Sequence, residues 1–186
     1  MRFVKDGSAL IFFHMGEQVR IEPWGRDALR VRSTMQRHFS GNAWALTEPV
    51  GHMQAQITIE EAEHRAEDGS VDKREQAVIV HGHIKAVVNH AGIISFYKDE
   101  KLILREYFRF YDGTISRESR CLKRTGRDWT GVAGGSEYAL NVKFEANKGE
   151  KIFGMGQYQD DCMDKKGCEL RCASSSTQPF LSMQSS

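Results

Sequence analysis

The chain has 186 residues, of which 40% are apolar and 27% are charged, and its formal net charge is +1. This composition is typical of a one-domain globular protein, and so small a net charge gives no field that would attract nucleic acid or an anionic membrane. No segment approaches the roughly 20 apolar residues that a membrane-spanning helix needs. We therefore expect a cytoplasmic protein with neither nucleic acid nor a membrane as partner.

The N-terminal third of the chain is rich in short strand-like patterns. The run "ALIFF", residues 9–13, is shorter than the apolar core of a secretory signal, about 7–15 residues. Strict alternation follows in "EQVRIEPW", where Val19 and Ile21 share a face, and again in "DALRVRST" and "HMQAQITIEEA". The segment "TIEEAEHRAED" has too few apolar positions for a packed helix. These patterns favour strands.

Similar patterns continue through the rest of the chain. They occur in "QAVIVHGHIKAVVNHAGIISFYKDEKLILREYF", "GTISRESRCLKR" and "SEYALNVKFEA", and turn signals such as "EDGS", "NHAG" and "NKGEK" separate them. Several short strands at regular spacing indicate a sandwich or barrel, and the short connections favour antiparallel pairing. We predict an all-β fold, an antiparallel β-sandwich, over residues 1–172.

The last residues differ in character. The segment "CASSSTQPFLSMQSS" is rich in serine and poor in apolar residues, so we expect residues 173–186 to form a disordered tail. The well-formed alternation before it stops abruptly. A truncated or frame-shifted reading frame would produce this pattern.

Four cysteines stand in the second half of the chain, at Cys121, Cys162, Cys168 and Cys172. In a chain without a secretory signal, reduced thiols are the simplest interpretation. The last three have the spacing C-x5-C-x3-C, which lacks the paired C-x2-4-C pattern of structural zinc sites. We expect no metal and no cofactor.

Three histidines, His81, His83 and His90, lie in "HGHIKAVVNH". An H-x-H pair on a strand places two imidazoles on one face, as in metal sites. No carboxylate or thiol is obviously paired with them. We expect surface histidines and keep a metal site as the alternative.

Two sets of aromatic residues raise further alternatives. Basic and aromatic residues interleave around Tyr97 and Arg105, as in single-stranded nucleic-acid platforms, but nearby glutamates dilute the charge and favour a solvated strand face. Trp24, Trp44 and Trp129 could stack on sugar rings or pack in the core. Sequence does not choose between these roles.

The stretch "GEKIFGMGQYQDD" and the residues after it form a glycine turn followed by a polar cluster. Amides and carboxylates are the groups that recognise sugar hydroxyls, and this segment supplies Gln157, Gln159, Asp160 and Asp164. A solvated polar loop is the other interpretation. A catalytic pair is not expected here, because retaining glycosidases hold two carboxyls about 5 Å apart and a mobile loop does this poorly.

The segment "VKFEANKGEKIFGMGQYQDDCMDKKGCELR", residues 142–171, resembles the end of the N-terminal domain of glycoside hydrolase family 31. The family turn "GE-x-[IL]-[YF]-G-[LM]-G" is matched here by "GEKIFGMG". The early segment "RDALRVRST" is also similar to the first strands of that domain. The likeness extends over most of residues 1–180.

The resemblance implies a β-sandwich similar to galactose mutarotase folds, followed in the family by a (β/α)8 barrel that carries both catalytic aspartates. It therefore implies no catalytic residue in this chain and a parent enzyme that hydrolyses α-linked xylosides or glucosides with retention. The implied partners are the barrel and α-linked xylose or glucose units, contacted by Gln157, Gln159, Asp160 and Asp164. A stand-alone carbohydrate-binding module and a structural interaction domain remain alternatives.

Overall fold

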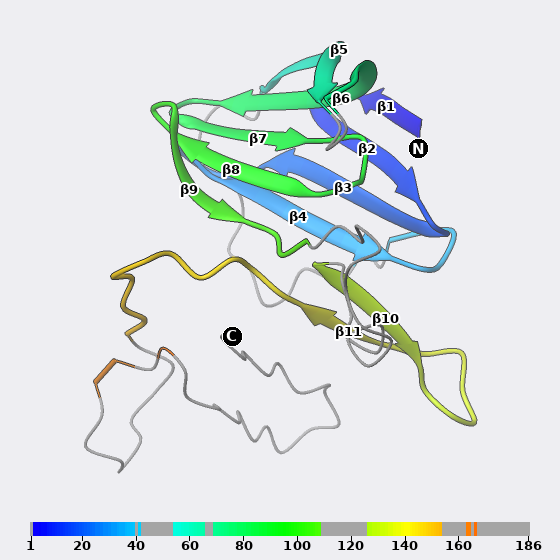
Figure 1. The fold of residues 1–186 in the computed structure, drawn as a ribbon. Coiled ribbons are helices and arrows are strands. Elements are labelled where there is room, and N and C mark those ends of the chain that lie inside the picture. The colour runs from blue at the N-terminus through cyan, green and yellow to red at the C-terminus, as the bar shows by residue number, and fades with distance from the viewer. Residues whose placement is uncertain are drawn as a thin grey trace. The chain divides into compact units, whose positions relative to one another are not determined.

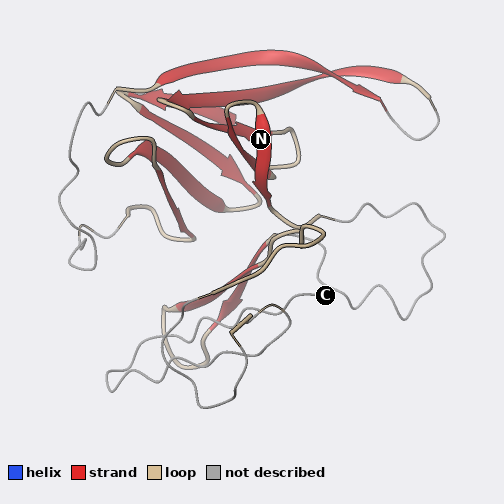
Figure 2. Ribbon diagram, turned by 90° about the vertical axis from the view of Figure 1, so that its left-hand side faces the viewer, coloured by secondary structure: helices blue, strands red, loops and turns tan. Residues whose placement is uncertain are grey.

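The computed structural model describes residues 2–39, 41, 54–65, 69–108, 126–153, 163–164 and 166. The chain divides into two compact units, Met1–Arg105 and Glu106–Ser186. They are called here the first and the second unit, and each is described by itself. Eleven described strands and no described helix make the protein all-β, as the alternation predicts (Figures 1 and 2). No helix long and apolar enough to cross a membrane occurs among the described residues.

The first unit contains a four-stranded and a five-stranded antiparallel sheet, both connected in simple sequential order. The strands of the first sheet are β1 (Arg2–Asp6), β2 (Ala9–His14), β3 (Glu17–Pro23) and β4 (Leu29–Thr34). Those of the second are β5 (Gln56–Arg65), β6 (Val71–His81), β7 (Ile84–Val88), β8 (Ile94–Lys98) and β9 (Lys101–Arg105). Sequential antiparallel order follows from the short connections, since parallel crossovers need about a dozen residues.

The core of the first unit comes from alternate residues of both sheets. In β3, Val19 and Ile21 are fully buried and Arg20 between them is half-buried, so the alternation in the sequence corresponds to a real inward face. A single cluster joins the two sheets, made of Phe3, Leu10, Phe12, Val19, Ile21, Ala77, Ile79, Ala86, Val88 and Ile94. The predicted antiparallel sandwich is confirmed for this unit.

The hairpin of β5 and β6 is longer than its neighbours. Strand β7 pairs only with Ala77–His81, so the other half of β6 is paired with β5 alone. Figure 2 shows this two-stranded end projecting beyond the rest of the first unit. Residues 58–65 of the segment rejected as a helix in the sequence are therefore part of a long strand.

Two turns from different sheets are hydrogen-bonded at one end of the sandwich. The ring of His81 is buried, with Nδ1 lying 3.0 Å from the carbonyl oxygen of Gln54 and Nε2 lying 2.7 Å from that of Gly25. In the adjacent turn, Asp27 Oδ1 accepts a hydrogen bond from the backbone N–H of His83 at 2.9 Å. These bonds join the turn after β3 to the turn after β6.

We expect Gly82→Ala to destabilise the first unit more than Gly7→Ala does. Both glycines have a φ of +58°, so either substitution places an L-residue in the left-handed region at a cost of about 1–2 kcal/mol. Nothing lies within 4 Å of a Cβ added at Gly7, whereas one added at Gly82 would overlap Asp27 Oδ1 and push it from the N–H of His83. Urea unfolding measures both changes, and equal losses would contradict this packing.

The second unit contains one described hairpin, formed by β10 (Arg127–Gly131) and β11 (Tyr138–Val142). An isolated bridge pairs Glu106 with Phe144, beyond the end of β11. Here Glu106 is 3% exposed, and its two carboxylate oxygens accept hydrogen bonds from Nη1 of Arg127. A buried ion pair thus joins the start of the unit to its hairpin.

Several predictions about boundaries lie outside what the structure tests. One domain over residues 1–172 stays a prediction, and the predicted tail of residues 173–186 lies outside the described residues, as does the strand-like run "GTISRESRCLKR". The structure adds strands that the alternation did not identify, namely β1, β2 and β10. All four cysteines also lie outside the described residues.

Candidate functional site

The candidate site is the polar segment at the end of the second unit. Of its four predicted sugar-contact residues, the structure describes Asp164, while Gln157, Gln159 and Asp160 lie outside the described residues. The surroundings of Asp164 are defined by the turn "NKGE" and by the described residues on either side of residues 154–162.

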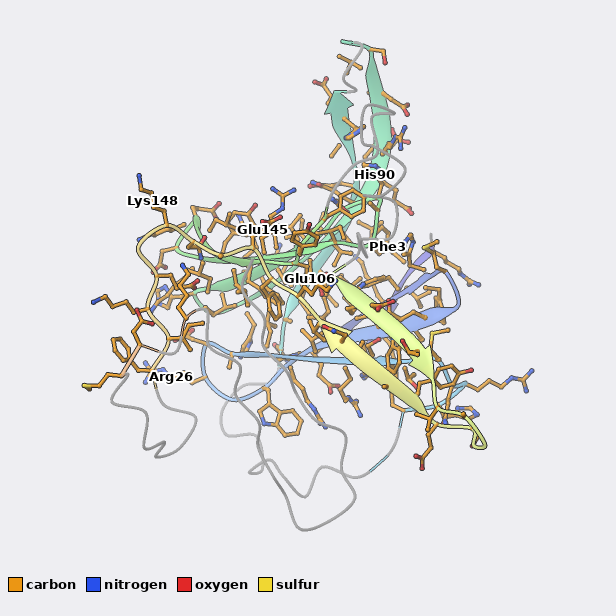
Figure 3. The ribbon with its side chains drawn as sticks, turned by 60° about the horizontal axis from the view of Figure 1, so that its bottom comes forward. Phe3, Arg26, His90, Glu106, Glu145 and Lys148 are labelled. Atoms are coloured by element: carbon orange, nitrogen blue, oxygen red, sulfur yellow. The ribbon has the colours of Figure 1, made fainter. Side chains whose placement is uncertain are left out.

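The turn from Asn147 to Glu150 is a hydrogen-bonded β-turn. The backbone N–H of Glu150 donates to the carbonyl oxygen of Asn147 at 3.2 Å, and Gly149 has a φ of +75°. A positive φ at the third position only, with this bond, is the signature of a type II turn, for which glycine is the favoured residue. The Lys148 side chain projects outward from this turn (Figure 3). The sequence signal "NKGEK" is therefore a true turn.

Asp164 lies half-buried beside this turn. Its Oδ1 accepts one hydrogen bond from the backbone N–H of Ile152 at 3.0 Å and another from that of Lys166 at 3.1 Å. The N–H of Ile152, followed by that of Lys166, lowers the pKa of Asp164 below its ordinary value of 3.8, because both bonds stabilise the charged carboxylate. The side chain is therefore ionised at neutral pH.

Lys166 adds a second connection between the same two segments. Its Nζ donates to the carbonyl oxygen of Asn147 and lies 3.7 Å from Oε2 of Glu150. The backbone N–H of Lys166 therefore contacts Asp164, whereas its ammonium contacts Asn147 and Glu150 in the turn. Asp164 and Lys166 thus both contact the turn or the residues directly after it.

This arrangement has a chemical consequence for sugar binding. The Oδ1 of Asp164 already accepts from two amides, so a sugar hydroxyl would compete with them for that oxygen. The sequence identified Asp164 by its polar neighbours but gave no sign of the Ile152 bond, which spans 12 residues. Sugar contact by Asp164 stays a prediction.

The three histidines considered as a metal site lie in different environments. His81 is buried between two carbonyls, so the expected surface position is wrong for that residue. His83 is exposed, and its Nδ1 lies 2.6 Å from Oδ1 of Asp99. The burial of His81 is explained by its alternation with Ala77 and Ile79 on the inward face of β6, which the sequence pattern already contained.

His90 contacts a histidine that the sequence did not single out. The His90 ring, at the base of the projecting hairpin in Figure 3, lies 4.4 Å from that of His64, centroid to centroid, in an edge-on arrangement. Burial, followed by the neighbouring His64, lowers the pKa of His90 below its ordinary value of 6.5. Within the described part of the chain, no group of three or more potential ligands is placed to hold a metal ion.

The described tryptophans contact protein groups. The Trp24 ring lies under the guanidinium of Arg30, 4.4 Å from the ring centroid, and the Trp129 ring meets that of Tyr138 edge-on at 6.2 Å. Trp44 lies outside the described residues. These contacts assign packing roles to Trp24 and Trp129.

Comparison with known proteins finds relatives that are much longer than this chain. No family model matches it. A curated protein of Pseudescherichia vulneris, described as an uncharacterized family 31 glucosidase ORF2, is 36% identical over 88% of this chain and 30% of its own length. The crystal structure of a GH31 α-xylosidase from a soil metagenome, complexed with xylose, matches with a TM-score of 0.75 and 32% identity over 96% of this chain and 25% of that one. The chain thus spans less than a third of either relative.

Proposed function

We infer that this chain is a β-sandwich domain of glycoside hydrolase family 31, and we propose that it is the non-catalytic N-terminal domain of such an enzyme. One observation carries the proposal: nearly the whole chain matches, in sequence and in fold, only 30% of a family 31 glucosidase and 25% of a GH31 α-xylosidase. The described part of the chain is also entirely β. Both facts fit a domain that accompanies a separate catalytic barrel.

The proposed activity of the parent enzyme is hydrolysis of α-linked xylosides or glucosides with retention. Its support is the likeness of this chain to part of a glucosidase and part of an α-xylosidase, and retention is what the family resemblance implies. In this proposal the barrel supplies the catalytic groups, and this chain supports the barrel and contributes the polar segment with Gln157, Gln159, Asp160 and Asp164 on the substrate side. The cytoplasmic location stays a prediction.

Exposed apolar side chains in the second unit support a protein partner. Phe153 is 60% exposed and Met163 is 81% exposed, and both adjoin the candidate site. Large apolar side chains gathered at a surface are typical of an interface. We propose that they contact the catalytic barrel of the parent enzyme.

The proposal predicts no turnover by the 186-residue chain alone. A catalytic group must lie within reach of the reacting bond, and the resemblance assigns both catalytic aspartates to the barrel. Purified chain incubated with p-nitrophenyl α-xyloside and α-glucoside should release no nitrophenol above a heat-denatured control. Release that is lost in a variant of a carboxylate in this chain would contradict the non-catalytic assignment.

A chimera tests the supporting role. This chain replaces the matched part of the Pseudescherichia vulneris relative, and the chimera should hydrolyse whichever of the two nitrophenyl substrates that relative hydrolyses. The relative without its matched part is the control and should be inactive or insoluble. A chimera that is folded but inactive would contradict the role, and saturable binding of xylose to the isolated chain would favour a stand-alone carbohydrate-binding module instead.

A further inference from the structure

Asp164 connects two segments that are distant in the sequence. Ile152 directly follows the turn at Asn147–Glu150 and its neighbour Lys151, while Asp164 and Lys166 lie 12 and 14 residues further along. The hydrogen bond from Lys166 to Asp164 spans two residues and is a local turn of a kind common for aspartate. The hydrogen bond from Ile152 is not local and needs another explanation.

We propose that Asp164 is a positioning residue, whose Oδ1 clamps the backbone amides of Ile152 and Lys166 and thereby sets the distance between residues 152 and 164. The clamp joins residues 152, 164 and 166 through groups of described residues alone.

Charge explains why aspartate suits this position. A hydrogen bond to an ionised acceptor is roughly twice as strong as a neutral one, and one carboxylate oxygen can accept two donors. The two N–H groups lower the pKa of Asp164, which is the expected result when both donors favour the charged form. An asparagine would keep one acceptor oxygen but lose the charge.

Lys166 strengthens the clamp through a separate contact. Its Nζ donates to Asn147, which begins the turn before Ile152, and it lies 3.7 Å from Glu150 Oε2. The Asp164 carboxylate and the Lys166 ammonium thus connect the same two segments by different groups. Because these two contacts lie at different points, they oppose both sliding and separation of the turn and the segment that contains Asp164 and Lys166.

The clamp is independent of the proposed glycosidase function. It concerns two backbone amides of this chain and needs neither sugar nor barrel. Failure of the chimera would leave it unaffected, and failure of the clamp would leave the family assignment unaffected.

Amide hydrogen exchange, followed by NMR on the full 186-residue chain, tests the clamp. We expect Asp164→Ala to lower the protection of the Ile152 amide by about tenfold or more, as for loss of a charged hydrogen bond. Asp164→Asn should restore part of the protection, because its amide oxygen can accept. Glu137→Gln is the control, since it changes an exposed carboxylate in the turn between β10 and β11 of the same unit, and it should leave the Ile152 amide protected.

The pH dependence separates the clamp from a general loss of structure. The folded pKa of Asp164 is lowered, so the clamp is complete above the ordinary pKa of 3.8 and is lost as pH falls through the lower folded value. Protection of the Ile152 amide should therefore decline with acid in the wild type and stay flat in Asp164→Asn. Unchanged Ile152 protection in Asp164→Ala, or equal loss in Glu137→Gln, would overturn the proposal.

Discussion

Replacing Phe12 by alanine should lower the free energy of unfolding of the first unit by about 3–5 kcal/mol. Phe12 is fully buried and is the largest side chain in the cluster that joins the two sheets. Its ring lies 6.1 Å from that of Phe3, centroid to centroid, in a tilted arrangement. The truncation removes apolar contacts and leaves a cavity that rigid strands on both sides cannot close.

The neighbouring residue provides the control for this experiment. Phe13 is 41% exposed, so Phe13→Ala should cost about 1 kcal/mol or less. Urea unfolding of both variants, followed by fluorescence or circular dichroism, measures the difference. Equal losses would mean that the inward face of β2 is assigned wrongly.

In the second unit, Arg127→Leu should cost about 3–5 kcal/mol, because it removes a buried cation that contacts both carboxylate oxygens of Glu106. The Arg127 and Glu106 side chains are 7% and 4% exposed. Water therefore cannot replace the guanidinium. Removing both charges should restore part of the loss, so the double variant Glu106→Leu with Arg127→Leu should be more stable than Arg127→Leu alone.

An exposed ion pair provides the control, because it shows what the loss of a cation costs where water can replace it. Arg74 and Asp72 form a contact of 2.9 Å with side chains 44% and 56% exposed, so Arg74→Leu should change stability by only about 0–1 kcal/mol. Thermal and urea unfolding of the three variants tests the argument. A loss for Arg127→Leu as small as that for Arg74→Leu would show that the pair is hydrated in solution.

The ion pair between Glu106 and Arg127 also bears on the segment around Asp164. The hairpin held by Glu106 and Arg127 precedes the turn at Asn147–Glu150 in the chain, and Asp164 accepts a hydrogen bond from Ile152, two residues after this turn. Loss of the ion pair should therefore also reduce protection at the Ile152 amide.

The fold class could be predicted from the sequence because a strand with one buried face requires alternation. Val19 and Ile21 in β3, and Ala77 and Ile79 in β6, are buried as their spacing indicates. The turn at Gly149 was equally predictable, since its positive φ favours glycine. Each of these features depends on residues that are close together in the chain, so the sequence alone is enough to predict it.

Other strands could not be predicted from the same pattern. In β2, Phe12 and Phe13 are adjacent apolar residues, so alternation is broken although one is buried and the other exposed. β10 has only Trp129 as a large apolar residue, and its extended form depends on pairing with β11. The partners that define these strands lie elsewhere in the chain.

By itself, the sequence determined the all-β class, the turns and the resemblance to family 31, since each rests on residues close together in the chain. Tertiary structure alone decided the roles of single polar residues. His81 is buried between carbonyls from two other segments, Glu106 meets Arg127 across 21 residues, and Asp164 reaches Ile152 across 12. A polar side chain takes its role from the donors and acceptors that folding brings to it, and no local pattern records which those are.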